Sequence, residues 1–192
     1  NFNTYQIIYI IEGDYKTLRI HKKKYQEISK IKFNKTDMNP PEGDLTVDSV
    51  TGTAMLIDRD KLKLINDWDT NIFNYFEDMD LCLRFRLKGF EIIKIRSAEV
   101  DHDAFASHDK SLSPQLDFSR NWHYSWSRFY FLKKHTTILR AYLYGLNIFV
   151  LSIIKSFFYL FFKRAKSITH FAKAYGTFYA ILNLPPNYRP KI

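Results

Sequence analysis

Three carboxylates crowd the start of a predicted helix, in the run Glu77-Asp78-Met79-Asp80. Backbone N–H groups and the helix dipole favour negative charge at a helix N-terminus. Asp80 and Arg84 are four residues apart and can pair along the helix surface. One interpretation is therefore a well-capped helix. The other is a carboxylate that points into a cleft and takes a proton from an acceptor hydroxyl, with the preceding aromatic residues as one wall.

Further motifs surround this cluster in a fixed order: Thr51-Gly52, Trp68-Asp69, Tyr75-Phe76-Glu77-Asp78-Met79-Asp80, Arg84, Gly89 and His102. With this order and spacing, residues Val47 to Ser107 resemble the second half of the catalytic domain of family 2 glycosyltransferases, especially the rhamnosyltransferase-like branch. Residues Asn121 to His135 resemble the aromatic segment that follows the domain in that branch.

The resemblance implies an inverting enzyme that moves a hexosyl or deoxyhexosyl group. The donor would be a nucleotide-sugar, and the acceptor a hydroxyl of a glycan, either lipid-linked or part of a polysaccharide. Asp78 would be the catalytic general base, because an inverting transfer needs one base on the acceptor face. The implied substrate-binding residues on the acceptor side are Thr51, Gly52, Glu77, Asp80 and Arg84.

The resemblance also implies a divalent metal, Mg²⁺ or Mn²⁺, that neutralises the diphosphate leaving group. His102 holds the place of a late histidine that completes the metal shell in many such enzymes. Most of the ligation would come from an Asp-x-Asp motif that this chain lacks; Asp58-Arg59-Asp60 imitates it but is interpreted as a helix cap. Because the donor-nucleotide half is not recognised either, we expect the chain alone to be inactive.

The elements that would position these residues are short. Leu45 to Ile57 predicts a buried strand, in which Gly52 suggests a bulge or a close approach of backbone to a ligand. Asp78 to Lys88 predicts a helix ended by Gly89, and Phe90 to Ile95 predicts another strand. The expected fold class is α/β: the C-terminal part of a GT-A (Rossmann-like) glycosyltransferase domain, followed by a basic, apolar α-helical tail.

Charge divides the chain in two. Its 192 residues carry a net charge of +9, yet residues 118–192 contain 12 basic residues and no acidic one. Residues 1–117 contain 17 basic and 20 acidic residues, a net charge of −3. We therefore expect a partial catalytic domain over 1–117 and a membrane-associating helical region over 118–192.

The apolar run Ala141 to Ile154 has 14 uncharged residues, fewer than the about 20 that a spanning helix needs. Lys155 interrupts it, and basic residues flank both ends. This pattern favours helices that lie on an anionic membrane surface over a spanning helix or a helix packed on the catalytic domain. We expect peripheral or monotopic attachment at the cytoplasmic face of the cell membrane.

Two other functions remain open. A non-catalytic membrane-associated binding module would share the same sequence features. A nucleic-acid binder is suggested by charge alone and predicts salt-sensitive binding. Since the basic residues stand among long apolar runs, no nucleic-acid partner is expected.

Overall fold

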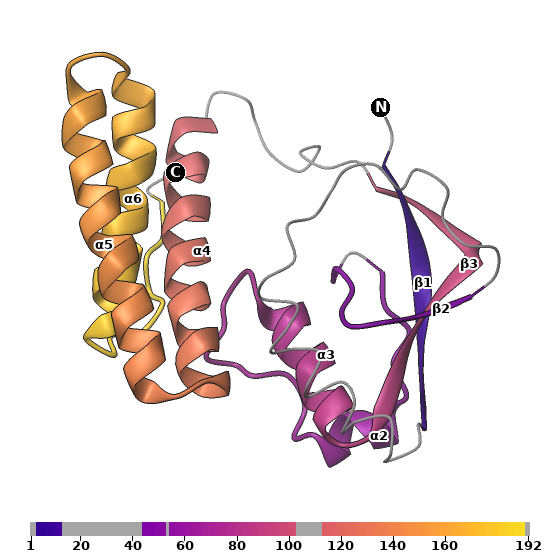
Figure 1. Cartoon of the computed structure of the whole chain (residues 1–192). Helices are drawn as coiled ribbons and strands as arrows, with labels where there is room; N and C mark the ends of the chain where they lie inside the picture. The colour runs from indigo at the N-terminus through magenta and orange to yellow at the C-terminus, as the bar shows by residue number, and fades with distance from the viewer. Residues whose placement is uncertain (1–2, 13–43, 53, 103–112, 191–192) are drawn as a thin grey trace. The chain divides into compact units, whose positions relative to one another are not determined.

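The computed structural model describes residues 3–12, 44–52, 54–102 and 113–190 (Figure 1). The chain forms two compact units. The first contains residues 1–68 and 78–104, and the second contains residues 69–77 and 105–192. The loop 69–77 therefore belongs to the second unit, although both of its sequence neighbours belong to the first.

The first unit contains an antiparallel sheet with the strand order β1-β3-β2. Strand β1 spans Asn3–Glu12, β2 spans Leu45–Val47 and β3 spans Phe90–His102. Ile92 of β3 stands opposite Ile10 on one side and Val47 on the other. The long central strand β3 therefore carries both neighbouring strands.

The described residues of the first unit also form two helices: α2 spans Arg59–Leu64 and α3 spans Glu77–Leu87. The side chain of Asp58 caps α2, as the sequence predicts, by accepting hydrogen bonds from the N–H groups of Asp60 and Lys61. Buried side chains of α3 form the core together with a residue that directly follows α2 and a residue of β3. These core residues are Ile65, Leu81, Cys82, Phe85 and Ile92, with Met55 in contact with both of their clusters.

The predicted α/β fold class is wrong. Helices hold most of the described residues, and every strand pairing in the sheet is antiparallel. A Rossmann-like domain instead alternates parallel strands with crossover helices. The strand predicted over Leu45–Ile57 ends at Val47, because the apolar residues after it, such as Val50 and Met55, pack into the core from a loop. A short apolar run cannot by itself distinguish these cases.

The second unit, over its described residues, contains three long helices: α4 over Ser113–His135, α5 over Ile138–Leu160 and α6 over Arg164–Ile181. Figure 1 shows them side by side, and α6 contacts both of the others. The core lies where α4 meets α6. Its buried residues are Trp122, Trp126, Phe129 and Ala180, and α4 presents its three at helical spacing. After α6, the C-terminal segment returns along α4, where the Trp126 indole N–H donates to the Leu184 carbonyl at 2.8 Å.

Two glycines allow the helices of this unit to approach closely. A Cβ atom on Gly176 of α6 would lie 2.2 Å from the Trp122 carbonyl oxygen on the backbone of α4. A Cβ atom on Gly145 of α5 would lie 2.5 Å from the side-chain ring of Phe129. At Gly176 the added Cβ atom would clash with backbone atoms. At Gly145 it would clash with a side-chain ring that can shift.

We expect Gly176→Ala to lower the free energy of unfolding by about 1–3 kcal/mol, since α4 and α6 must separate to admit the methyl group. The better helix propensity of alanine offsets only about 1 kcal/mol. Gly145→Ala is the control and should cost less, because only the Phe129 ring has to move. Urea unfolding followed by circular dichroism measures both. A Gly176→Ala protein as stable as the parent would contradict the close approach.

Candidate active site

The Asp78 carboxylate joins two segments of the first unit. Its Oδ2 atom accepts a hydrogen bond from the Gly52 backbone N–H at 2.9 Å, and its Oδ1 atom accepts one from the Met79 N–H at 2.7 Å. The structure thus brings together Thr51-Gly52 and Asp78, which the sequence analysis placed in one site. Thr51 and Gly52 are exposed and Asp78 is half-buried. The carboxylate is therefore held in one orientation while it remains accessible.

Gly52 leaves the surface beside Asp78 uncovered. A Cβ atom at this position would lie 3.6 Å from the Asp78 Cβ, which is an ordinary contact. Gly52 is also not among the residues with positive φ in the described part of the chain. The protein's own packing therefore gives no reason for glycine here, and a larger side chain would cover the surface next to the carboxylate.

Asp80 and Arg84 form the predicted ion pair, with the Arg84 Nε 2.7 Å from the Asp80 Oδ2. Asp80 is fully buried. The Nη1 of Arg84 also donates to the carbonyls of Ile65 and Asp67, at 2.5 and 2.6 Å. These carbonyls belong to the turn after α2, where Asn66 and Asp67 have positive φ values of 61° and 55°. The pair therefore fixes the turn after α2 to α3, and a direct contact of either residue with substrate stays a prediction.

Glu77 is the first residue of α3 and is half-buried. It belongs to the second unit, whereas Asp78 belongs to the first. The change of unit thus falls within the first turn of the helix that carries the candidate base. A role of Glu77 on the acceptor side stays a prediction.

The loop 69–77 is attached to α4 within the second unit. The Asp69 Oδ2 accepts hydrogen bonds from the Lys134 ammonium at 2.7 Å and the Tyr130 hydroxyl at 3.0 Å. Further along the loop, the Asn74 carbonyl accepts a hydrogen bond from the Ser127 hydroxyl at 2.7 Å. The loop is thus bound to one face of α4 at two points, through the Asp69 side chain and through the Asn74 carbonyl.

The aromatic residues of this loop are held in a rare backbone conformation. Tyr75 and Phe76 have positive φ values of 65° and 67°, which is unusual for bulky residues and costs free energy. Ring contacts with α4 hold them there: Tyr75 and Phe76 both contact Tyr124, and Phe76 also contacts Phe131. Backbone strain of this kind concentrates at functional sites.

His102, the predicted metal ligand, is the last residue of β3 and pairs in register with Asn3. Its side chain lies outside the part of the chain that the structure describes. Within that part, no group of three or more His, Cys, Asp or Glu side chains is placed to hold a metal ion. Asp78 and Asp80 face different partners, so the described carboxylates do not form a metal site. The metal stays a prediction, and no step proposed for this chain uses one.

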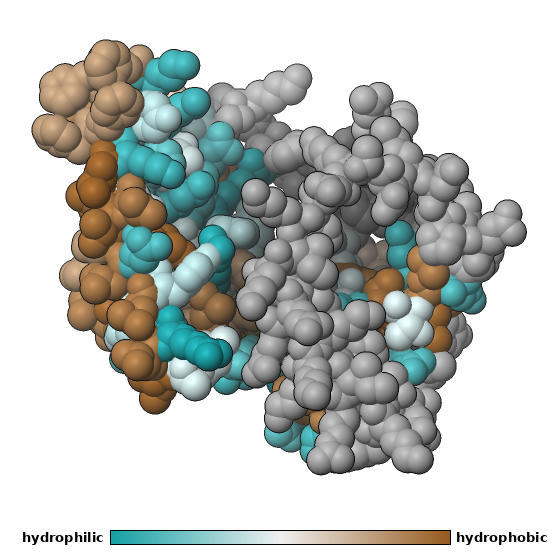
Figure 2. Space-filling view, in the orientation of Figure 1, coloured by the Kyte–Doolittle hydropathy of each residue, from teal (hydrophilic) through white to brown (hydrophobic). Residues whose placement is uncertain are grey.

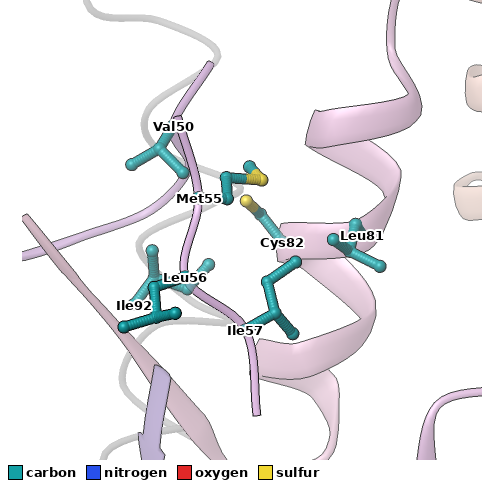
Figure 3. Close-up of a pocket in the computed structure, with 7 residues that line it drawn as sticks. All are labelled: Val50, Met55, Leu56, Ile57, Leu81, Cys82 and Ile92. Carbon is teal, nitrogen blue, oxygen red and sulfur yellow. The ribbon is translucent and has the colours of Figure 1, made fainter. Parts of the chain in front are cut away.

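A small pocket in the first unit is lined by Val50, Met55, Leu56, Ile57, Leu81, Cys82 and Ile92 (Figure 3). Its volume of about 10 Å³ leaves room for a single water molecule at most. Pockets for small-molecule ligands are usually larger, about 300–1,000 Å³. Burial raises the pKa of the Cys82 thiol to about 11, so this thiol is a poor nucleophile. The pocket is a packing defect of the core and not a substrate site.

Sequence reasoning missed Asp69 as an anchor, because an Asp-rich chain offers many similar residues. A signal was nevertheless present in α4. Ser127, Tyr130 and Lys134 are spaced by three and four residues, so they form one polar row on a helix that is otherwise rich in aromatic residues. A polar row of this kind predicts a partner segment.

The pH dependence of stability tests the Asp69 anchor. Burial raises the pKa of Asp69, but the hydrogen bonds from Lys134, Asn71 and Tyr130 outweigh it and place the pKa below its ordinary value. The anchor therefore stabilises the fold above pH of about 4, and this contribution is lost as the pH falls through the folded-state pKa.

We expect Asp69→Asn to lower the free energy of unfolding by about 1–2 kcal/mol at neutral pH. The difference from the parent should shrink below pH of about 4, where the parent also loses its charge. Asp117→Asn is the matched control, since this exposed carboxylate pairs with Arg120 on the surface. Chemical unfolding at neutral and acidic pH measures the effect. A pH-independent difference would rule out a charged anchor.

Comparison with known proteins adds no relative to this picture. No family model, no curated protein and no solved structure matches the chain. The resemblance to family 2 glycosyltransferases, carried by the motifs around Asp78, therefore stays a prediction.

Proposed function

We propose that this chain carries the acceptor side of an inverting glycosyltransferase, with Asp78 as the general base. The observation that supports it most is the pair of backbone N–H groups, from Gly52 and Met79, that orient the Asp78 carboxylate. Motifs far apart in sequence but joined in the resemblance thus meet at one accessible carboxylate.

The geometry leaves the Asp78 carboxylate able to accept a further hydrogen bond. A carboxylate has about four lone-pair positions, and the two backbone bonds to Asp78 use one on each oxygen. A sugar hydroxyl can therefore donate its hydrogen bond to either oxygen. A base that is already fixed in place reacts without first losing orientational freedom.

The proposed reaction is a single displacement. Asp78 takes the proton of the acceptor hydroxyl while the hydroxyl oxygen forms a bond to the anomeric carbon of the donor sugar. The bond from this carbon to the diphosphate breaks, and the nucleoside diphosphate leaves with the electron pair. The configuration at the anomeric carbon is inverted, because attack and departure occur on opposite faces.

One further observation supports a site at this position. Gly52 leaves the surface beside Asp78 uncovered, where an acceptor would have to lie. The proposal assigns only the acceptor side to this chain and leaves donor binding to other residues.

We expect Asp78→Asn to reduce sugar transfer by about 10²-fold or more, since the amide cannot take the proton. The fold should be retained, because the amide oxygen still accepts the Gly52 hydrogen bond. Transfer is measured with the full-length protein as nucleoside diphosphate release from a panel of UDP- and dTDP-sugars, with membrane lipid extract as acceptor.

Asp60→Asn is the matched control, since Asp60 is a highly exposed carboxylate of the same unit, paired only with Lys63 in the ion pairs found. It should leave transfer unchanged. Near-normal transfer by Asp78→Asn would remove Asp78 as the base. Binding of glycans without any transfer by the parent protein would instead favour the non-catalytic binding module.

A further inference from the structure

The outward side of α5 carries a continuous apolar stripe. We call the outer stripe the exposed residues Leu139, Leu143, Leu146, Val150, Ile153 and Phe157, which follow one another at alternating spacings of four and three. This spacing keeps them on one side of a helix over about 27 Å. In Figure 2 hydrophobic colour covers much of the α5 side of the second unit. Such an extended apolar surface marks an interaction site.

Lys155 interrupts the apolar run in the sequence. In the structure it does not interrupt the outer stripe. Lys155 follows Ser152 by three residues and precedes Tyr159 by four, so it shares their side of the helix. Ser152 is buried, and Tyr159 stacks on His170 of α6. Lys155 therefore lies at the flank of α5, beside the packed side, with its side chain exposed.

The turn between α5 and α6 combines exposed aromatic rings with positive charge. Phe161 and Phe162 are 70% and 72% exposed. Lys163, Arg164 and Lys166 follow directly and are also exposed. Aromatic rings beside cations suit the boundary between acyl chains and anionic headgroups, where rings enter the apolar layer and cations meet phosphates.

By length and composition, α5 is also able to cross a membrane, since Ile138–Leu160 is apolar over most of its 23 residues. Its packing argues against crossing. The Ser156 and Ser167 side chains each donate to the other's backbone carbonyl, at 3.0 and 2.7 Å, and so tie α5 to α6. If α5 crossed, α6 would enter the bilayer with Lys166, His170 and Lys173, and charged groups there are unfavourable.

A second copy of this chain is a poor occupant for the stripe. Residues 118–192 contain 12 basic residues and no acidic one. Two copies that met through this region would bring together surfaces that carry positive charges and no acidic side chain of residues 118–192, and like charges repel. An anionic surface has the complementary charge.

We propose that the outer stripe of α5 and the α5–α6 turn form a membrane-docking surface that lies in the interface of an anionic bilayer without crossing it. The apolar stripe enters the acyl boundary, and the flanking cations bind headgroup phosphates. This surface does not depend on the proposed enzymatic function, and its test uses no turnover.

Vesicle flotation with two matched double variants tests the surface. Leu143→Glu/Leu146→Glu changes two stripe residues that are 60% and 55% exposed. Leu64→Glu/Leu87→Glu changes two leucines of the first unit with the same exposures, 60% and 55%, and the same change of charge. The parent protein should float with phosphatidylcholine vesicles that contain phosphatidylglycerol, and less with phosphatidylcholine alone. The stripe variant should bind at least about tenfold more weakly, and the control should bind like the parent.

Three results would overturn the proposal. They are equal binding by the two double variants, absence of parent binding to anionic vesicles, and a parent dimer that only the stripe variant loses. Because the stripe leucines are exposed, the stripe variant should fold, and its circular dichroism spectrum checks this.

A depth measurement separates an interfacial helix from a crossing one. Val150→Cys places a thiol at the middle of the stripe for a nitrobenzoxadiazole label, while Cys82 is buried and its high pKa, about 11, slows its labelling. Quencher lipids labelled near the headgroup should quench this probe more than lipids labelled near the chain end. Stronger quenching by the deep label would show that α5 crosses the bilayer, and the interfacial docking surface would be wrong.

Discussion

Burial of the Asp80 carboxylate determines which way the start of α3 faces. A buried charge is tolerated only with a partner, and Arg84 supplies it one helical turn later. Residues two positions apart in a helix point to nearly opposite sides. With Asp80 turned into the interior, Asp78 has to point away from it, and there its carboxylate meets the Gly52 N–H. The orientation of the proposed base thus follows from the burial and ion pair of its neighbour Asp80.

The second unit uses α6 as a shared partner. Its Gly176 approaches the backbone of α4 closely, its Ala180 packs with the α4 tryptophans, and its Ser167 is hydrogen-bonded to α5. This arrangement uses the polar side of α5 internally and leaves the leucine, isoleucine and phenylalanine side outward. The usual order of a water-soluble helix is reversed on that face, which suits an apolar environment better than water.

Local signals allowed parts of the structure to be predicted from sequence. The cap at Asp58, the start of α3 and the Asp80–Arg84 pair follow from short-range rules, since the partners lie within four residues. The antiparallel sheet could not be predicted in this way, because β1 and β3 are separated by about eighty residues and an apolar run does not reveal which strand it pairs with. The resemblance of motifs placed Gly52 and Asp78 in one site, but it did not predict the hydrogen bond between them. The Arg84 bonds to two carbonyls carried no sequence signal, since any residue has a carbonyl.

The assignment of the loop 69–77 to the second unit has a consequence for synthesis on the ribosome. The chain is made from its N-terminus, so Asp69 emerges long before Lys134, which follows it by 65 residues. Until α4 has emerged, the aromatic residues of this loop have no α4 rings to pack against. All residues of the first unit emerge before α4, but the segment that interrupts this unit in sequence has to wait for that later helix. A nascent chain stalled before α4 would therefore expose Tyr75 and Phe76, and chaperones bind exposed apolar side chains of this kind.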